Sequence, residues 1–232
     1  MDPTRKTARW AGLLYFLTIP LGMTGLIYVP SKLFVPGDSA ATAGNIRSFT
    51  ALLRLGIASE LLAQIFLIYS VLLLFRLFRP VSETLARQLV VLGALVSAPI
   101  LFVNVINEFA ALILAGGGGT LTVFDQPQRD ALAYLFMQLH GRGYVVAEIF
   151  WGLWLFPFGL LVIRSGFIPR LLGVALIIAG VGYVAESASV ILLPNLDDAV
   201  NAIARLLELG ELPIIFWLMV WGARARRQAG ER

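Results

Sequence analysis

The stretch RLGIASELLAQIFLIYSVLLLFR, residues 54–76, is the clearest membrane-spanning segment in the chain. Arg54 opens it, Glu60 follows after five intervening residues, and Arg76 closes it after fifteen more. Almost every residue between Glu60 and Arg76 is apolar, and an apolar run of about 20 residues is long enough to cross the hydrocarbon layer of a membrane. The stretch therefore predicts a transmembrane helix that carries a carboxylate within the bilayer.

The same spacing of charges occurs twice more along the sequence. The three copies are Arg54–Glu60–Arg76, Arg142–Glu148–Arg164 and Arg205–Glu211–Arg227. A rise of 1.5 Å per residue places each Glu about 24 Å from its second Arg, so the three carboxylates are expected at one depth. The pattern favours three pseudo-repeated helical hairpins. Three unrelated helices that obey the positive-inside rule would account for the second Arg of each copy but not for the Glu.

The composition is that of a membrane protein. The chain has 232 residues, of which 59% are hydrophobic and 14% charged, and its mean hydropathy is +0.84. We predict an all-α integral membrane protein, a six-transmembrane-helix bundle that forms a single polytopic membrane domain over residues 1–232. The expected helices are residues 10–29, 51–75, 88–115, 143–163, 171–193 and 206–222, with an amphipathic outer segment at 131–140.

The basic residues sort by loop. Most of the Lys and Arg side chains lie at the chain ends and in the loops after the second and fourth expected helices, and this asymmetry predicts that both termini are cytoplasmic. The expected location is the cytoplasmic membrane of a prokaryote, with membrane lipids as partners. The net charge is +4, and the position of the basic residues in the cytoplasmic loops accounts for most of the positive charge. No nucleic-acid partner is therefore expected.

The chain contains no Cys and a single His, His140. Disulfides, Fe–S clusters and thiol catalysis are therefore excluded, as are haem with two His ligands and sites that need three His ligands. No cofactor is predicted. His140 and Glu148 are eight residues apart on one broad helix face, which makes them the candidate pair for a metal, but one His does not establish a metal site and none is predicted.

Ionisable groups inside a membrane are unfavourable and usually functional. The candidate ligand-binding residues are Glu60, Glu148, Glu186, Glu211, His140, Asn104, Glu108, Arg54, Arg142 and Arg205. Each has a structural alternative. The Glu side chains could be interhelical clamps, the Arg side chains interface anchors, and Asn104 a hydrogen-bonding contact between helices.

Several short motifs resemble those of a bacterial multi-pass membrane family catalogued as domain of unknown function 4386. They are Arg164-Ser165-Gly166-x-Ile168-Pro169-Arg170-x-x-Gly173 with Gly182-Tyr183, Val35-Pro36-Gly37-Asp38 through Asn45-Ile46, Arg54-Leu55-Gly56, Leu139-His140 with Gly143-Tyr144, and Gly210-Glu211-Leu212. The similarity covers essentially the whole chain. It implies a six-helix prokaryotic membrane protein and no established activity.

Three functions remain open from the sequence. The favoured one is a buried acidic site in the outer half of the bilayer that binds or transports a small cationic or proton-coupled solute. The alternatives are an intramembrane lipid-modifying enzyme that uses Glu and His for acid–base chemistry, and a non-catalytic membrane sensor or assembly partner. The sequence does not predict an oligomeric state.

Overall fold

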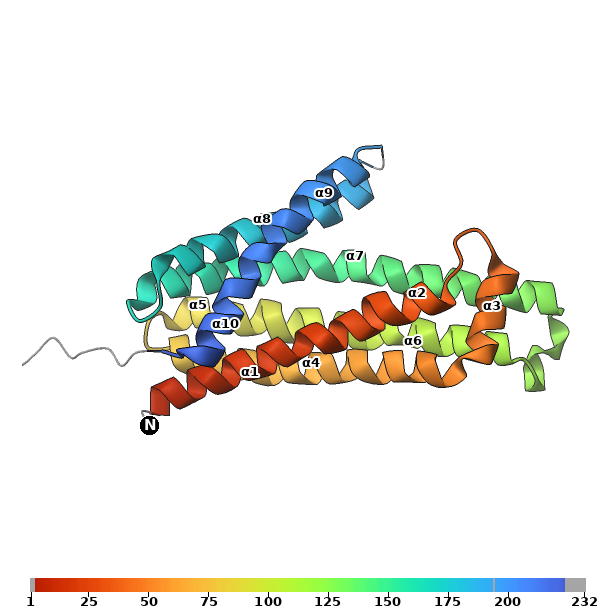
Figure 1. Ribbon diagram of the computed structural model, residues 1–232, viewed down its shortest axis with the longest axis horizontal. Coiled ribbons are helices and arrows are strands. Elements are labelled where there is room, and N and C mark those ends of the chain that lie inside the picture. Colours follow the sequence, from red (N-terminus) through yellow and green to blue (C-terminus); the bar gives the residue numbers. More distant parts are fainter. Residues whose placement is uncertain (1–2, 194, 224–232) are drawn as a thin grey trace, which may run out of the picture. The chain divides into compact units, whose positions relative to one another are not determined.

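The computed structural model describes residues 3–193 and 195–223, and within these ranges the chain is helical without a strand (Figure 1). The predicted all-α class is therefore confirmed. Residues 224–232 lie outside the described ranges, and they include Arg227 of the third charge copy.

Five stretches of helix are long and apolar enough to cross a membrane. The first, Thr4–Leu33, combines α1 (Pro3–Met23), η1 (Thr24–Tyr28) and α2 (Val29–Leu33). The second is α4 (Thr50–Phe78), and the third, Glu83–Gly116, combines α5 (Glu83–Val90), η2 (Val91–Val96) and α6 (Ser97–Gly116). The last two are α7 (Gln126–Ser165) and α8 (Arg170–Leu192).

The shorter described helices are α3 (Ser39–Ser48), η3 (Gly119–Val123), α9 (Asp197–Glu208), η4 (Leu209–Glu211) and α10 (Leu212–Val220). The sixth predicted helix, residues 206–222, covers the end of α9, η4 and α10, so no single helix there has the length of a span. Pro213 contributes to this division because it has no N–H for the carbonyl four residues earlier.

Two predicted boundaries differ from the structure. The segment 131–140 and the helix expected from residue 143 form one continuous helix, α7, which begins at Gln126 and passes through Gly141 and Gly143. The connection after the first expected helix contains α3, which Asp38 caps by accepting a hydrogen bond from the Ala41 N–H at 2.8 Å. Helix capping by an Asp side chain stabilises a helix start that hydrophobic periodicity does not mark.

Two π-helical turns, η1 and η2, interrupt the apolar spans. In each turn a backbone N–H donates to the carbonyl five residues earlier, Val29 to Thr24 and Ser97 to Leu92. A proline follows each turn, Pro30 after η1 and Pro99 after η2. Because proline cannot donate a backbone hydrogen bond, the wider turn forms where the regular α-helical ladder is already broken.

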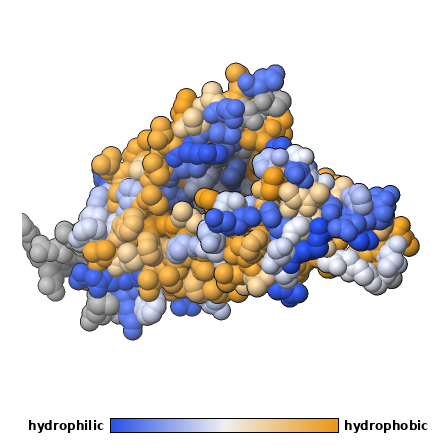
Figure 2. Space-filling view, turned by 45° about the vertical axis from the view of Figure 1, so that its right-hand side comes forward, coloured by the Kyte–Doolittle hydropathy of each residue, from blue (hydrophilic) through white to orange (hydrophobic). Residues whose placement is uncertain are grey.

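Large apolar side chains are exposed along the spans. Val103, Ile106 and Ile113 of α6 are exposed, and Figure 2 shows apolar side chains (orange) over much of one face. Water would disfavour so much apolar surface, whereas lipid chains solvate it. Together with the five apolar spans, this surface identifies the chain as a polytopic membrane protein.

The contacts divide the chain into two compact units. Unit 1 comprises residues 1–17, 66–98 and 145–232, and unit 2 comprises residues 18–65 and 99–144. The two units are described separately below, within their described residues.

Paired glycines hold α7 and α8 together in unit 1. A Cβ atom added to Gly159 would lie 2.5 Å from the carbonyl oxygen of Gly173, and one added to Gly152 would lie 2.6 Å from that of Gly180. Small residues at these positions let the two backbones approach closely, which is how helices associate in lipid. The turn between the helices uses Gly166 at a φ of +73° and Pro169 as the residue before α8.

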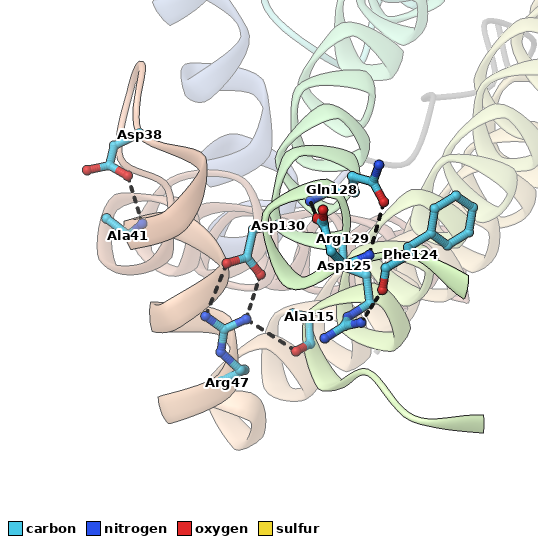
Figure 3. A network of polar contacts seen from close by, with 9 residues as sticks. All are labelled: Asp38, Ala41, Arg47, Ala115, Phe124, Asp125, Gln128, Arg129 and Asp130. Atoms are coloured by element: carbon cyan, nitrogen blue, oxygen red, sulfur yellow. Dashed lines mark hydrogen bonds and ion pairs between the residues drawn. The ribbon is translucent and has the colours of Figure 1, made fainter. Parts of the chain in front are cut away.

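Unit 2 has an apolar core and an ion pair near one end. The core includes Val29, Leu33, Ile46, Leu53 and Val105. Figure 3 shows Arg47 of α3 contacting both carboxylate oxygens of Asp130 in α7, at 2.7 and 3.4 Å. Arg47 also donates to the carbonyl of Ala115 at the end of α6, so one guanidinium connects three helices.

We predict that Gly159→Ala lowers the thermal stability of the purified protein, because the new methyl group meets the Gly173 backbone. Overpacking of this kind destabilises by about 1–3 kcal/mol. The measurement is the unfolding temperature in mild detergent.

The matched control is Gly141→Ala, on the same helix, where no heavy atom lies within 4 Å of the added Cβ. This variant should melt at the wild-type temperature or slightly above it, because Ala favours helix by up to about 1 kcal/mol over Gly. Equal melting of Gly159→Ala and Gly141→Ala would contradict the close approach of α7 and α8.

Candidate functional site

Three helices of unit 2 bring two carboxylates and the single histidine together. Glu60 lies on α4, Glu108 on α6 and His140 on α7, and one ligand atom from each lies within 4.8 Å of the other two. The Nε2 atom of His140 is 3.1 Å from Oε2 of Glu60 and 3.7 Å from Oε2 of Glu108. Their exposed fractions are 2% for Glu60, 0% for Glu108 and 2% for His140, so the cluster is fully buried.

Helical periodicity places the three residues on buried faces. Each is spaced three, four or seven residues from buried neighbours on its own helix. The neighbours are Leu53, Ile57 and Gln64 on α4, Leu101, Asn104 and Ala111 on α6, and Ala133, Met137 and Tyr144 on α7. The polar side chains are thus part of the same stripes that form the core of unit 2.

Hydrogen bonding of the two carboxylates is incomplete. Oε1 of Glu60 and both carboxylate oxygens of Glu108 are buried without a hydrogen-bond partner among the described residues. Arg47 is engaged by Asp130, while Arg54 and Arg142 have exposed side chains. A buried carboxylate without compensation is strongly unfavourable, so the cluster requires a proton or a cation.

Neighbouring polar groups hold the cluster in place. Tyr144, one turn after His140, packs edge-on against the His140 ring with 5.2 Å between the ring centroids, and its hydroxyl lies close to the Glu60 carboxylate. The Nδ2 group of Asn104 donates to the backbone carbonyl of His140 at 2.9 Å, and Asn107 donates to the Asn104 side chain at 3.0 Å. These contacts orient the Glu60 side chain and the helix that carries His140.

Two glycines make room for the cluster and its support. A Cβ atom on Gly25, in the π-helical turn η1, would collide with the Glu60 side chain, and a Cβ atom on Gly143 would collide with the Asn104 side chain. Gly143 therefore serves close packing inside a straight run of helix. π-helical turns frequently occur at functional sites, and η1 lies directly against Glu60.

The candidates predicted from the sequence fall into two groups. Glu60, Asn104, Glu108, His140, Arg54 and Arg142 belong to unit 2, whereas Glu148, Glu186, Glu211 and Arg205 belong to unit 1. His140 groups with Glu60 and Glu108, and Glu148 is not part of that set of ligand atoms.

The acidic residues of unit 1 form their own polar group. The Nε atom of Arg205 lies 3.5 Å from Oε1 of Glu186, and the Tyr183 hydroxyl donates to Oε2 of Glu211 at 2.9 Å. The Glu208 side chain lies close to Glu186. Here an Arg compensates part of the negative charge, which is the difference from the Glu60 cluster.

Tyr144 and Asp130 were not predicted as polar contacts, and the close contact of Gly25 with Glu60 was not predicted either. Tyr144 lies four residues after His140, so the helical spacing was a usable signal. Gly25 and Asp130 gave no such signal, because their roles depend on residues far away in the sequence.

We predict that Gly25→Ala disturbs the cluster, because the added methyl group displaces Glu60. The unfolding temperature should fall by the equivalent of about 1–3 kcal/mol. Gly22→Ala on α1 is the control, since no heavy atom lies within 4 Å of its added Cβ.

The result that would count against the arrangement is a Gly25→Ala variant as stable as Gly22→Ala. A second measurement separates local from global effects. Hydrogen exchange should increase in the peptides around residues 25 and 60 in Gly25→Ala and should stay unchanged in Gly22→Ala.

Comparison with known proteins agrees with the motif resemblance. The family described as domain of unknown function (DUF4386) matches residues 10–222. No curated protein and no solved structure matches the chain.

Proposed function

The chain belongs to the family of domain of unknown function 4386, and from that premise we propose that it binds and transports a small cationic solute at Glu60, Glu108 and His140. A solute whose movement is coupled to protons fits the same site. The observation that carries the proposal is the cluster of two buried carboxylates whose oxygens are only partly satisfied.

The location of the cluster supports a cationic ligand. All three residues lie within helices that are long and apolar enough to span a membrane. Ionisable groups at such positions usually mark a pathway or a binding site for ions or solutes. A positively charged ligand would supply the compensation that no described Lys or Arg side chain of unit 2 supplies to Glu60 or Glu108.

The polar group of unit 1 supports proton coupling. Glu186 and Glu208 lie close together, and two neighbouring carboxyl groups favour the binding of a proton by one of them. Glu148 and Glu211 belong to the same unit, so protonatable side chains are present beyond the Glu60 cluster.

We propose the topology that the loop charges favour. The protein has six spans, with residues 206–222 as the sixth, and they are arranged as three related hairpins within one membrane domain. Both termini face the cytoplasm of a prokaryotic cell, membrane lipids surround the bundle, and no nucleic acid is involved.

One contact favours a second candidate function. His140 and Glu60 are within hydrogen-bonding distance, at 3.1 Å, and such a pair could transfer protons to a lipid substrate as general acid and base. An intramembrane lipid-modifying enzyme is therefore the alternative for this cluster.

We predict that a small cation raises the unfolding temperature of the purified protein. The panel is Na⁺, K⁺, Mg²⁺, Mn²⁺, Zn²⁺ and methylammonium at constant ionic strength. A ligand at 100 times its Kd adds about 2.7 kcal/mol to the free energy of unfolding. Glu60→Gln and Glu108→Gln should abolish the shift, because each removes one negative charge from the site.

Glu83→Gln is the matched control, because Glu83 lies at an exposed helix start where it pairs with Arg79 and Arg87. It should retain the full shift. The proposal fails if no cation of the panel stabilises the wild type, or if the shift survives in both Glu60→Gln and Glu108→Gln. Uptake of the stabilising cation into proteoliposomes then separates transport from binding alone.

A further inference from the structure

We infer that Glu60, Glu108 and His140 form a binding site for a divalent first-row transition-metal ion. The inference rests on the proposed cation-binding function and specifies the chemical class of the cation. One imidazole nitrogen and two carboxylate oxygens, each from a different helix, are the ligands.

The spacing of the ligand atoms suits one small ion. Nitrogen and oxygen ligands lie about 2.0–2.2 Å from Zn²⁺, so adjacent ligands of one ion are separated by about 2.8–3.6 Å. The His140–Glu60 distance of 3.1 Å falls within that range, and the His140–Glu108 distance of 3.7 Å is just outside it. The ligand atoms of Glu60 and Glu108 lie within 4.8 Å of each other, so binding of one ion would draw the two carboxylates closer together.

The charge and burial of the site favour a divalent ion. The two carboxylates carry up to two negative charges, and three of their four oxygens are buried without a hydrogen-bond partner among the described residues. A doubly charged ion compensates both carboxylates at once and coordinates oxygens that are otherwise unsatisfied. A single Lys or Arg carries one positive charge and would therefore compensate only one of the two carboxylates.

The ligand types favour a transition metal over Ca²⁺ or Mg²⁺. Ca²⁺ takes six to eight oxygen ligands and Mg²⁺ is bound through oxygen with several waters, whereas imidazole suits ions such as Zn²⁺, Fe²⁺ and Ni²⁺. Three protein ligands also leave at least one coordination position open, as in metal sites that bind a further molecule.

Residues around the three ligands are placed so that they orient them. The Tyr144 hydroxyl contacts the Glu60 carboxylate, and Asn104 holds the His140 backbone carbonyl at 2.9 Å. Gly25 admits the Glu60 side chain by close contact. Outer contacts of this kind orient metal ligands, and their loss typically weakens metal binding about 10–100-fold.

The test uses full-length protein in mild detergent, stripped with a chelator and titrated with Co²⁺ and with Zn²⁺. Co²⁺ should give visible absorption bands characteristic of nitrogen and oxygen ligation, and Zn²⁺ should displace it. Glu60→Gln, Glu108→Gln and His140→Gln should each weaken binding by more than the about 10–100-fold cost of an outer-shell change. Tyr144→Phe, which keeps all three ligands, should weaken binding about 10–100-fold while the protein remains folded.

Glu83→Gln, at the exposed start of α5, is the control and should bind Co²⁺ as the wild type does. Absence of Co²⁺ and Zn²⁺ binding, with retained stabilisation by Na⁺, K⁺ or methylammonium that depends on Glu60, overturns the metal assignment and leaves the proposed function standing. Absence of every cation effect overturns both. Metal binding that is equal in the wild type, Tyr144→Phe and the three ligand variants also overturns the assignment.

Discussion

Two carboxylates lie within the apolar interior of unit 2, and their burial is favourable only if neighbouring groups compensate them. Glu60 and Glu108 are almost completely buried, and neither has an Arg or Lys partner among the described ion pairs. In the part of the chain that the structure describes, His140 is the member of the cluster that can carry a positive charge, and it lies within 3.7 Å of both carboxylates. The glycine that admits Glu60 and the asparagine that holds the His140 helix follow from the need to keep these groups at short distances.

Packing in unit 1 depends on a different interaction. Helices within lipid gain little from burying apolar surface, because lipid chains are as apolar as Leu, so close backbone contact and hydrogen bonds carry the association. The Gly152–Gly180 and Gly159–Gly173 contacts provide such an approach along α7 and α8. Ser187 adds a hydrogen bond from α8 to the Val145 carbonyl of α7, at 2.6 Å. The stability of the α7–α8 hairpin therefore depends on these four glycines, which have no side chain to separate the two backbones.

The sequence predicted the helices better than it predicted their partners. The length of an apolar run is a local property, and it was sufficient for the helical class and for the five long spans. Glu60, Glu108 and His140 were each identified as candidates, because a polar residue inside an apolar run is visible locally. That His140 meets Glu60 and Glu108 was not predicted, because it depends on how α4, α6 and α7 pack.

The repeated Arg–Glu–Arg spacing likewise did not predict which residues each Glu contacts. Glu60 and Glu211 occupy equivalent positions in the pattern, but the first contacts His140 and the second accepts a hydrogen bond from Tyr183. Equal spacing along the chain therefore places similar side chains in different surroundings. Gly141 and Gly143 flank Arg142, and both lie within the continuous helix α7, where Gly143 packs against Asn104.

The π-helical turn η1 also changes the direction in which the side chains after it point, relative to those before it. A π turn contains one residue more than an α turn, so residues after Tyr28 are rotated by about 100° relative to an uninterrupted helix. A helical wheel drawn through residues 10–23 is therefore out of phase with residues 29–33. The extra residue gives the span two differently directed stripes, and a single-residue deletion within the turn would merge them into one.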